Sequence, residues 1–575
     1  MKWFARVDVS ERKASKTKIK DEMERWGGRL FIAKILTNEV PPTCEPLGRY
    51  NKLIIASGLL GDTPVTTSGK ISIGGKSPLT GGIKESNVGG FAGKRLANLG
   101  IRAVIIEGLP RKPGTDMLII NSKGIELVPV PELRFKLVSD TIKYLRTHFG
   151  NDIGIFCIGP AGEMLMSGAG IASPDNNDIQ IRYAARGGLG ALMGSKGIKA
   201  IVVDDSNSKY KPEYFDRELL TRISREIIDD LKDDPKTENR HLYGTPAIIS
   251  LANKSGLLPT KNFSVGQFEY AEEISGETIR KVIAERGKEG RSGTPCVPGC
   301  FIKCSNVFPD KKGKKIVASL QYENIIMLGP NCGIGNLDDI AEMDNLCNEV
   351  GVDAIETGAA LGVAMEAGLM KFGDAKNAKD MITQIGKGTV LGRVIGNGAY
   401  ITGKVLGVQR VPVIKKQGVP AYDPRALKGN GVTYFTSPMG PDHTAGNAFE
   451  TLKTTDPLGI EQQVENSRRL QVRAAILDSF GLCIFVRPAF VRNPEFLFQV
   501  LKGRYGWDLK IQNVLDIGME VLKTERKFNS LAGVSEDSYS MPEFMMDEPL
   551  PPTNSRFDIS LEKMKSVWDI KQEIF

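Results

Sequence analysis

Residues 68–108 read SGKISIGGKSPLTGGIKESNVGGFAGKRLANLGIRAVIIEG, and this glycine-dense stretch sets the character of the first part of the chain. Glycine tolerates positive φ and lets another group approach the backbone closely. Short apolar runs lie before, within and after it, at 52–56, 103–107, 117–120 and 200–203. Gly, Pro and Ser clusters separate these runs, which is typical of short strands joined by turns. The first two hundred residues are therefore predicted to be β-rich.

The pattern changes to helical after the polar stretch DDSNSKYKPEY at residues 204–214. Apolar residues then recur at helical spacing in 215–232, 338–350, 354–369 and 465–479. No repeat of 20 to 50 residues is visible. We predict an α+β chain with a β-rich N-terminal cofactor-binding domain at 1–207 and two mainly helical domains, at 208–410 and 411–575.

Composition excludes several classes of protein. The 575 residues are 41% hydrophobic and 25% charged, as expected for a soluble globular chain of several domains. The N-terminus lacks the apolar stretch of a signal peptide and no later segment is long enough for a membrane span, so a cytoplasmic location is expected. The net charge of +8 would suit an acidic electron carrier. Lys and Arg are spread along the chain without a nucleic-acid-binding motif, so nucleic acid is not expected as a partner.

The cysteines indicate a metal centre. Eight cysteines without a paired pattern fit a reducing compartment better than a disulfide scaffold. Cys296, Cys300 and Cys304 are each separated by three residues, and closely spaced thiolates with a remote fourth are typical of iron–sulfur clusters. A zinc site or plain buried thiols remain as alternatives, although no histidine lies nearby. Spacing leaves the fourth ligand open among Cys44, Cys157, Cys332, Cys347 and Cys483.

One short pattern occurs twice. NEVGVD at 348–353 and DSFGLC at 478–483 both lie where an amphipathic helix is predicted to end at a glycine. Two such helix ends would present similar polar groups to two halves of one ligand.

Five motifs together resemble the tungsten-dependent aldehyde ferredoxin oxidoreductase family. They are KSPLTG at 76–81, IGPAGE at 158–163, RGGLGALMGSK at 186–196, GPNCGI at 329–334 and DSFGLC at 478–483. Any one of them is weak evidence, but they occur in the family's order over most of the chain.

The resemblance implies a β-rich domain that seats two pyranopterin dithiolene cofactors and two helical domains that close over them. The dithiolenes hold one tungsten, or molybdenum, beside a [4Fe-4S] cluster, and a Mg²⁺ ion bridges the cofactor phosphates. The family pattern selects Cys483 as the fourth cluster ligand and assigns pterin contacts to Asp353 and Asp478, for which the alternative role is an ordinary helix cap. The remaining predicted cofactor contacts are Lys70, Asn87, Gly89, Gly90, Arg186, Gly187, Gly188, Asn348 and Leu482.

Four features depart from the family pattern. Residues 342–345 read EMDN where some relatives carry Glu-x-x-His for an iron at a homodimer interface, so no such iron is expected and that dimer is not assumed. The first gap between cluster cysteines is three residues where relatives usually have two. Asn348 stands where many relatives have Asp, so the side chain offers no charge. Lys70 stands where relatives often have an Arg that links cluster and pterin, so the cation is kept but the planar fork is lost.

The resemblance also nominates two catalytic residues. His443 matches a position beside the metal and is predicted to donate a hydrogen bond to the substrate oxygen, with a structural loop histidine as the alternative. Glu323 matches the family's active-site glutamate and is predicted to act as general base for water, with an ordinary surface or paired carboxylate as the alternative.

The function implied is oxidation of an aldehyde to a carboxylic acid, with electrons passing to ferredoxin or a polyferredoxin-like small subunit. An oligomer is allowed but not required. Two alternatives remain: the tungsten subunit of a reductive complex of the benzoyl-CoA reductase type, and a non-catalytic iron–sulfur relay subunit that keeps the fold.

Overall fold

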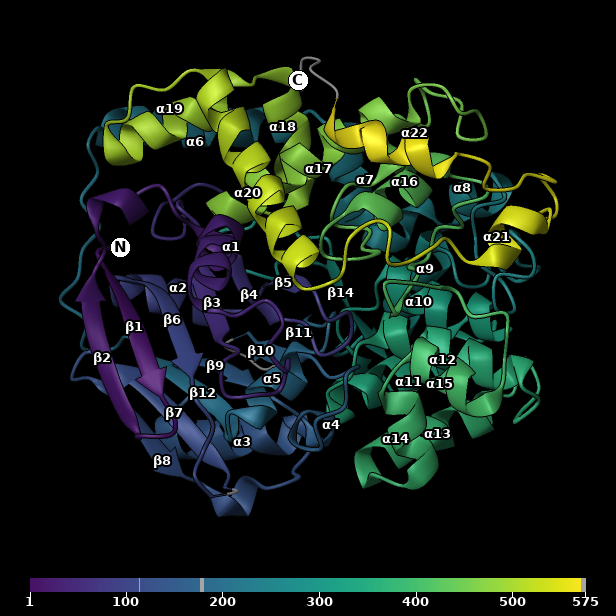
Figure 1. The fold of residues 1–575 in the computed structure, drawn as a ribbon, viewed down its shortest axis with the longest axis horizontal. Helices are drawn as coiled ribbons and strands as arrows, with labels where there is room; N and C mark the ends of the chain where they lie inside the picture. The colour runs from purple at the N-terminus through teal and green to yellow at the C-terminus, as the bar shows by residue number, and fades with distance from the viewer. Residues whose placement is uncertain (113, 176–179, 570–575) are drawn as a thin grey trace.

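The structure is a computed structural model that describes the whole chain except residues 113, 176–179 and 570–575. The first two hundred residues form two six-stranded sheets of mixed direction, and most of the remaining chain is helical (Figure 1). The predicted α+β class is therefore confirmed. The strands of the first sheet are β1 Trp3–Asp8, β2 Lys13–Lys18, β3 Leu53–Ser57, β4 Ile71–Lys76, β5 Ile83–Val88 and β6 Ile101–Glu107. Those of the second are β7 Asp116–Asn121, β8 Ile125–Pro129, β9 Gly154–Cys157, β10 Ile171–Pro174, β11 Ile181–Ala184 and β12 Ile198–Asp204.

The two sheets share one topology. Their strand orders are β2-β1-β6-β3-β4-β5 and, read from the matching edge, β8-β7-β12-β9-β10-β11. Each begins with an antiparallel hairpin, pairs its first strand in parallel with its last, and continues antiparallel to the opposite edge. Helices enter at matching points: α1 Gly28–Glu39 and α3 Val138–Phe149 precede the third strands, and α2 Ala92–Asn98 and α5 Leu189–Ser195 precede the last. Residues 3–107 and 116–204 are thus two copies of one unit, longer than the repeats sought in the sequence.

The two copies pack in layers. Helices α2 and α5 lie between the sheets, where their apolar side chains share one core with residues of both. Helix α1 covers the outer face of the first sheet and α3 that of the second. Central strands such as β12, whose sequence IKAIVVD is almost wholly buried, are rich in β-branched residues that suit a strand covered on both faces.

The predicted helices are present. The expected segments 215–232, 338–350, 354–369 and 465–479 correspond to α6 Arg217–Lys232, α11 Leu337–Val350, α12 Ala354–Glu366 and α17 Gln463–Phe480. Helix α6 begins where the Asp216 carboxylate accepts from the Leu219 N–H at 2.8 Å, and it buries an apolar face at helical spacing. The other helices of eight or more residues are α7 Pro235–Tyr243, α9 Gly276–Arg286, α13 Ala375–Lys387, α15 Ala399–Leu406, α16 Lys428–Thr436, α19 Glu495–Tyr505 and α20 Ile511–Leu531.

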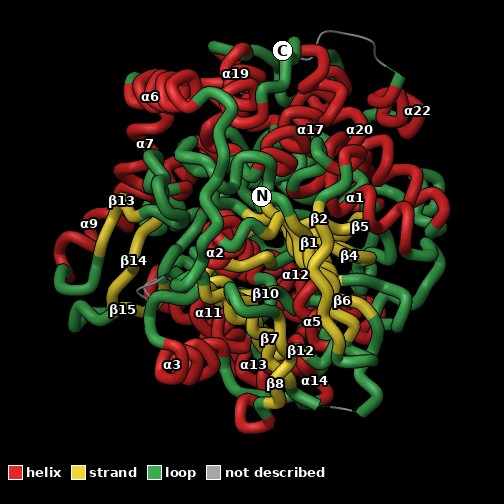
Figure 2. The backbone as a smooth tube through the Cα atoms, turned by 90° about the vertical axis from the view of Figure 1, so that its left-hand side faces the viewer, coloured by secondary structure: helices red, strands yellow, loops and turns green. Residues whose placement is uncertain are grey.

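The helices form two cores that do not follow chain order. One contains the helices from α9 to α16, which include α10 Tyr322–Leu328 and α14 Val390–Gly396. It is joined by residues near the C-terminus, including those of α21 Glu543–Asp547 and α22 Leu561–Lys565. The other joins α6 to α17, α19 and α20, with α18 Arg487–Arg492 beside them. Figure 2 shows this second group gathered at one end of the molecule, with the two sheets toward the other.

In the part of the chain that the structure describes, no single helix is long and apolar enough to cross a membrane. Taken together, α17 and the segment 484–492, which meet at a bend of 116°, pass the same test of length and composition. Most residues of α17 are buried against other helices.

Candidate functional site

The three closely spaced cysteines lie on the loop between the short strands β13 Arg291–Thr294 and β14 Ser305–Pro309. Within it, Pro298 and Gly299 form a tight turn, closed by a 3.3 Å bond from the Cys300 N–H to the Val297 carbonyl. Gly299 has φ of +72°, which glycine adopts readily at the second central position of a turn. The predicted turn in the first gap is confirmed, and all three thiols are buried.

Cys483, just after the end of α17, lies near the three cysteines of this loop. Its N–H donates to Thr67 Oγ1 at 3.1 Å. Burial raises the pKa of Cys300 to about 12, and the neighbouring Cys296 and Cys483 thiols add to this effect. Burial, Cys296 and Cys483 likewise raise the pKa of Cys304. The tertiary structure thus brings together the four cysteines that the family resemblance selected.

The surroundings of these thiols fit an iron–sulfur cluster. Burial lowers the pKa of Lys70, but Cys296 and Cys483 more than compensate, so the pKa of Lys70 is raised. The charged form of a lysine is stabilised when the thiols beside it are ionised. A bound metal keeps buried thiols in that ionised form. The Lys303 N–H also points at Cys300 Sγ, 3.5 Å away. Among the described residues, no three His, Cys, Asp or Glu side chains form a site for a single metal ion.

The two similar helix ends dock on the two sheet units in the same way. Helix α11 ends at Gly351 and α17 at Gly481, each in the left-handed conformation, as predicted. A Cβ on Gly159, after β9, would lie 2.4 Å from the Val350 carbonyl oxygen, and one on Gly58, after β3, would lie 2.0 Å from the Gly481 nitrogen. Only glycine permits this contact on either side.

Polar atoms without partners collect on the matching strands β4–β5 and β10–β11. In the first sheet Ser72 pairs in register with Asn87, and in the second Ser173 pairs with Arg182. Ser72 Oγ, Asn87 Nδ2, Ser173 Oγ and Arg182 Nε are all buried without a hydrogen-bond partner among the described residues. Because unpaired buried polar atoms are costly, this arrangement fits a polar ligand such as the two predicted pterins.

The two predicted pterin carboxylates differ in their protein contacts. Asp478 Oδ2 lies 3.3 Å from Arg29 Nη1, and burial raises the pKa of Asp478. Asp353 is the N-cap of α12, since one oxygen accepts from the Ile355 N–H at 3.0 Å, and its other oxygen lies 3.1 Å from Arg186 Nε. Asp353 therefore has the cap geometry weighed as its alternative role. Its assignment to a pterin stays a prediction.

Arg29 anchors this part of the site to the first sheet unit. It is 1% exposed and makes two hydrogen bonds of 2.8 Å to Glu525 of α20. We expect Arg29→Met to lower the free energy of unfolding by about 3–5 kcal/mol, because Glu525 would remain buried without its partner. Denaturant titration measures this. Lys34→Met, which breaks the more exposed Lys34–Glu520 pair between the same two helices, should cost less than about 1 kcal/mol. Equal losses of unfolding free energy in the two variants would contradict the role of Arg29 and Glu525 as a stabilising buried ion pair.

The two glycine pairs predicted to bind the cofactor phosphates contact different parts of the structure. Gly90 N–H donates to the Cys296 carbonyl at 2.8 Å, so Gly89 and Gly90 abut the cysteine loop. Gly187 instead packs against the side chain of Lys84, and its carbonyl accepts from Ser77 Oγ at 2.8 Å.

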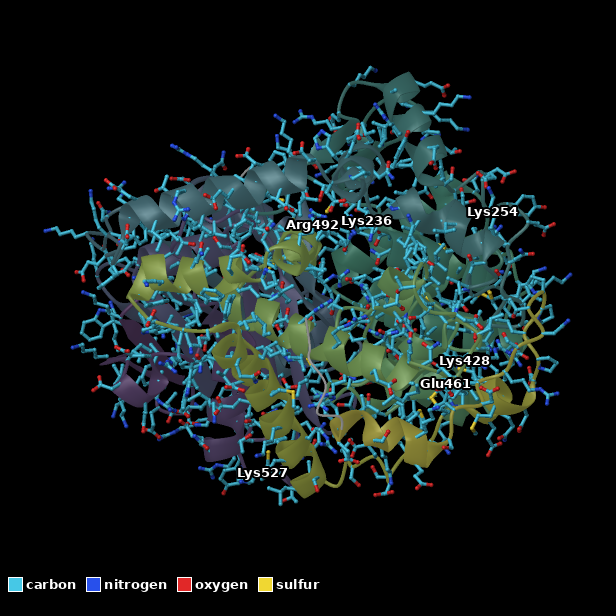
Figure 3. The ribbon with its side chains drawn as sticks, turned by 90° about the horizontal axis from the view of Figure 1, so that it is seen from above. Lys236, Lys254, Lys428, Glu461, Arg492 and Lys527 are labelled. Carbon is cyan, nitrogen blue, oxygen red and sulfur yellow. The ribbon has the colours of Figure 1, made fainter. Side chains whose placement is uncertain are left out.

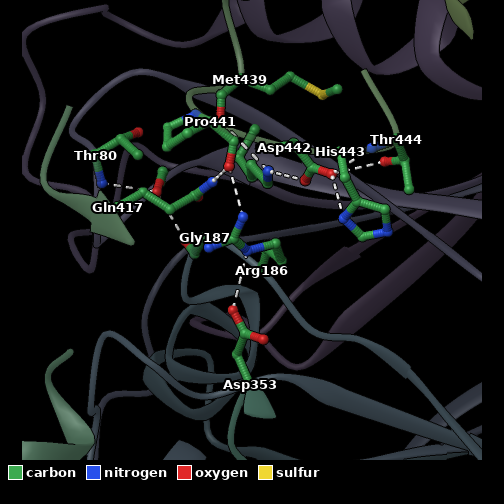
Figure 4. Close-up of polar contacts among 12 residues, drawn as sticks. Thr80, Arg186, Gly187, Asp353, Gln417, Met439, Pro441, Asp442, His443 and Thr444 are labelled. Atoms are coloured by element: carbon green, nitrogen blue, oxygen red, sulfur yellow. Dashed lines mark hydrogen bonds and ion pairs between the residues drawn. The ribbon is translucent and has the colours of Figure 1, made fainter. Parts of the chain in front are cut away.

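Arg186 ties the glycine turn to the loop that carries His443 (Figure 4). Its guanidinium donates to the Pro441 carbonyl at 2.5 Å and the Gly418 carbonyl at 2.6 Å, in addition to Asp353. Lys84, fully buried, lies 3.0 Å from Asp442 Oδ2. Burial disfavours the Asp442 carboxylate, but Lys84 and Arg186 outweigh it and lower its pKa. These buried ion pairs hold the residue that precedes His443.

Glu323 and His443 meet at the end of this network. Glu323 Oε1 is 3.4 Å from His443 Nδ1, and neither atom has a hydrogen-bond partner in the described chain. The other oxygen, Oε2, accepts from the Ala421 N–H at 2.8 Å, which fixes the carboxylate. Burial raises the pKa of Glu323, against the opposing effect of His443. The two predicted catalytic residues are therefore adjacent, with Glu323 buried and the His443 side chain 26% exposed, and each has one buried polar atom without a partner among the described residues.

Asn348 and Leu482 have local roles. Leu482 is buried, and its N–H closes the end of α17 on the Leu477 carbonyl at 2.9 Å. Asn348 lies on the wall of a cavity of about 710 Å³ between α3, α11 and the short strand β15 Lys315–Val317, and its carbonyl accepts from the Tyr183 hydroxyl. Its contact with a pterin stays a prediction.

Family models match nearly the whole chain. Residues 4–205 match the N-terminal domain of aldehyde ferredoxin oxidoreductase, and residues 222–568 match its domains 2 and 3. The chain belongs to the aldehyde ferredoxin oxidoreductase family. The curated aldehyde ferredoxin oxidoreductases that it resembles contain tungsten.

Three relatives show the range of the aldehyde ferredoxin oxidoreductase family. The tungsten-containing aldehyde ferredoxin oxidoreductase of Pyrococcus furiosus is 32% identical, over 95% of this chain and 92% of its own length. That of Pyrococcus abyssi is 34% identical, over 92% and 88%. The WOR-like subunit of an aliphatic sulfonate oxidoreductase from Pyrococcus furiosus is 26% identical, over 95% and 89%.

A solved structure shares the family fold. The active-site complex BamBC of benzoyl coenzyme A reductase, bound to 1,5-dienoyl-CoA, superposes with a TM-score of 0.78 at 18% identity, covering 99% of this chain and 93% of that one. At this identity the likeness shows the fold alone.

Sequence reasoning missed several site residues of this aldehyde ferredoxin oxidoreductase family member. Lys84 is buried in β5 beside Glu85, and two adjacent charges in a short strand were a usable signal. The duplicated spacing was another: Gly89 follows Ile83 as Gly187 follows Ile181, by six residues in each case. Arg29 and Asp442 carried no such signal.

Proposed function

We propose that the chain is a tungsten or molybdenum bis-pyranopterin oxidoreductase that oxidises aldehydes to carboxylic acids. Electrons would leave through a [4Fe-4S] cluster to ferredoxin or a small electron-transfer subunit. The observation that supports this best is the buried pair of free atoms, Glu323 Oε1 and His443 Nδ1, 3.4 Å apart. Family membership supports the metal and the redox class.

The chain's own residues supply the acid–base work in this proposal. Oxidation of an aldehyde to a carboxylate adds the oxygen of one water and releases two electrons and three protons. Glu323, held by Ala421 N–H, would accept a proton from the attacking water. His443 would donate a hydrogen bond to the substrate oxygen as negative charge develops there. Tyr322 and Tyr422, with ring centroids 5.0 Å apart, wall the site beside Glu323 and exclude bulk water.

The cofactors would be held by the residues that fit them. Asp353, Asp478, Asn87 and Arg182 offer polar atoms for the pterins, and the glycine pairs at 89–90 and 187–188 admit the phosphates and their Mg²⁺. Cys296, Cys300, Cys304 and Cys483 would ligate the cluster. When bound, the metal accepts an electron pair and the cluster passes electrons on singly. In this arrangement, 1–207 would seat the cofactors and the segments 208–410 and 411–575 would close over them.

Metal analysis followed by an aldehyde panel tests the proposal. We expect the purified holoprotein to contain tungsten or molybdenum together with iron, and to reduce a viologen dye with simple aliphatic or aromatic aldehydes. Iron without tungsten or molybdenum would identify a relay subunit instead. Both metals without aldehyde oxidation, but with reduction of an aromatic acyl-CoA by a low-potential donor, would identify a reductive catalyst.

A further inference from the structure

The segment around the three loop cysteines carries most of the net charge of the chain. Residues 286–315 contain eight Lys and Arg but only two Asp and Glu, whereas the net charge of all 575 residues is +8. The rest of the chain is therefore close to balance. Positive charge gathers on the part of the sequence that holds Cys296, Cys300 and Cys304.

This segment forms a small sheet at one side of the molecule. Strands β13, β14 and β15 pair antiparallel, and the cysteine loop joins β13 to β14. The turn DKKGK at 310–314 joins β14 to β15 and closes where the Gly313 N–H donates to the Asp310 carbonyl at 2.9 Å. Figure 2 shows the three strands next to α9. Figure 3 labels Lys236, a further exposed cation, on α7, which packs against β13.

Six cations of this sheet are exposed and form no ion pair with another side chain among the described residues. The two carboxylates of the segment are occupied by backbone groups instead. Glu289 accepts from the Lys315 N–H at 2.8 Å, and Asp310 accepts from the N–H groups of Lys312 and Lys314 at 2.8 and 2.9 Å. We call the six exposed cations the basic surface: Lys288, Arg291, Lys303, Lys311, Lys312 and Lys314.

The cavity of about 710 Å³ beside the turn extends the basic surface. Its described lining contains four cations and one carboxylate, that of Glu349, which accepts from the Ser139 hydroxyl at 2.7 Å. An acidic loop of another protein would find complementary charge there. The four cations are Lys143, Arg146, Lys314 and Lys315.

The loop cysteines lie just beneath this side of the molecule. They are 7–8% exposed, whereas Cys157, Cys332 and Cys347 are wholly buried. Within the loop Gly299 and Lys303 are exposed, and a Cβ on Gly299 would meet no other atom within 4 Å. A redox protein that contacts this loop would therefore come close to the thiols.

One partner of ordinary size would cover both the cysteine loop and the turn. A strand rises about 3.3 Å per residue, so the five residues of β14 separate the two by roughly 17 Å. A standard protein interface buries about 800 Å² on each side, which corresponds to a patch roughly 30 Å across. The basic surface thus has the dimensions of a single docking site.

We infer that the basic surface and the cavity beside it dock a small acidic one-electron carrier protein of the ferredoxin type over the cysteine loop. The inference rests on the proposed function for the source of the electrons, and on the basic surface for the position and charge of the partner. Each aldehyde oxidised releases two electrons, so two oxidised carriers are each reduced by one. Opposite charge speeds the encounter of the two proteins, and salt weakens this effect.

Nucleic acid is the other polyanion that such charges attract. Proteins that bind single strands combine cations with aromatic side chains on which bases stack. The aromatic residues of the segment 286–315 are Phe301, which is half-buried, and Phe308, which is buried. The basic surface therefore favours an acidic protein.

The test reverses three charges of the turn at once, in Lys311→Glu/Lys312→Glu/Lys314→Glu. The probe is a purified acidic ferredoxin with two [4Fe-4S] clusters, used as electron acceptor for the holoenzyme at low salt. We expect the KM for ferredoxin to rise at least about ten-fold and its dependence on salt to disappear. The rate with methyl viologen, a cationic dye, should stay unchanged, which also shows that the variant is folded and loaded.

The matched control is Lys13→Glu/Lys16→Glu/Lys18→Glu. These lysines lie on β2, an edge strand that is exposed along its whole length. The control changes the net charge by the same amount at a place far along the chain from the cysteine loop. It should leave the KM for ferredoxin within about two-fold of the wild type.

Two measurements need no aldehyde and separate the outcomes: calorimetric binding of oxidised ferredoxin, and its reduction by dithionite-reduced enzyme in stopped flow. Both should be weakened in the turn variant alone. If aldehydes reduce viologen but the turn and β2 variants treat ferredoxin alike, the inference fails while the proposed function stands. If no aldehyde reacts but ferredoxin binds through the turn, the reverse holds. A single-stranded RNA oligonucleotide that binds more tightly than ferredoxin and displaces it would also overturn the inference.

Discussion

Glu323→Gln should lower aldehyde turnover by roughly 10²–10⁴-fold while tungsten and iron contents stay at wild-type levels. The amide keeps the size of the side chain and can still accept from the Ala421 N–H, 2.8 Å away in the wild type, but it cannot take a proton from water. Steady-state kinetics with a viologen acceptor, together with elemental analysis, measures both quantities. Loss of metal along with activity would point to a structural role instead.

The pH profile gives an independent reading of the same residue. Because burial raises the pKa of Glu323 above the ordinary value of 4.5, the base is lost on acidification at a higher pH than for an exposed glutamate. Turnover in the wild type should therefore fall on the acid side with a midpoint above 4.5, and this limb should vanish from the residual activity of Glu323→Gln. Glu342→Gln, which alters a half-exposed carboxylate paired with Lys379, is the matched control and should keep both rate and profile. An unchanged acid limb in Glu323→Gln would assign it to another group.

Cys483→Ser should abolish electron transfer and deplete iron, although Cys483 lies 179 residues after Cys304 in the chain. A serine hydroxyl is a far poorer ligand for iron than a thiolate, and the three loop cysteines would be left with an incomplete site. Iron analysis and the visible absorption of the reduced and oxidised protein measure the loss.

The matched control is Cys44→Ser. Cys44 is half-buried beside Lys76 and Lys196, far along the chain from the cysteine loop, and its loss should leave iron content unchanged. If instead Cys483→Ser keeps a full complement of iron, the fourth ligand is another residue.

Several features were predictable from the sequence because they depend on local chemistry. The turn at Pro298 and Gly299 follows from the preferences of those two residues, and the helix ends at Gly351 and Gly481 follow from the left-handed conformation that glycine tolerates. Strand and helix positions followed from the spacing of apolar residues. The ordered motifs then predicted the family, which the domain matches confirm.

Other features depended on contacts between distant segments. The duplication of the sheet unit escaped notice because the two copies share topology rather than sequence, apart from the spacing of their glycine pairs. The pairing of Arg29 with Glu525 joins residues 496 positions apart, and no pattern in either helix predicts its partner.

By itself, then, the sequence determined the cysteine spacing, the glycine turns and the helix ends of this protein, since spacing and backbone preference are local properties. Only the tertiary structure decided that the glycine pair within residues 68–108 and its counterpart in the second unit have different neighbours. Gly89 and Gly90 contact the Cys296 carbonyl of the cysteine loop. Gly187 contacts the side chain of Lys84, which pairs with Asp442 beside His443. The physical reason is that the two like units make like contacts with each other, since Gly89 lies against Arg182 as Gly187 lies against Lys84, whereas the cysteine loop occurs once in the chain and abuts Gly89.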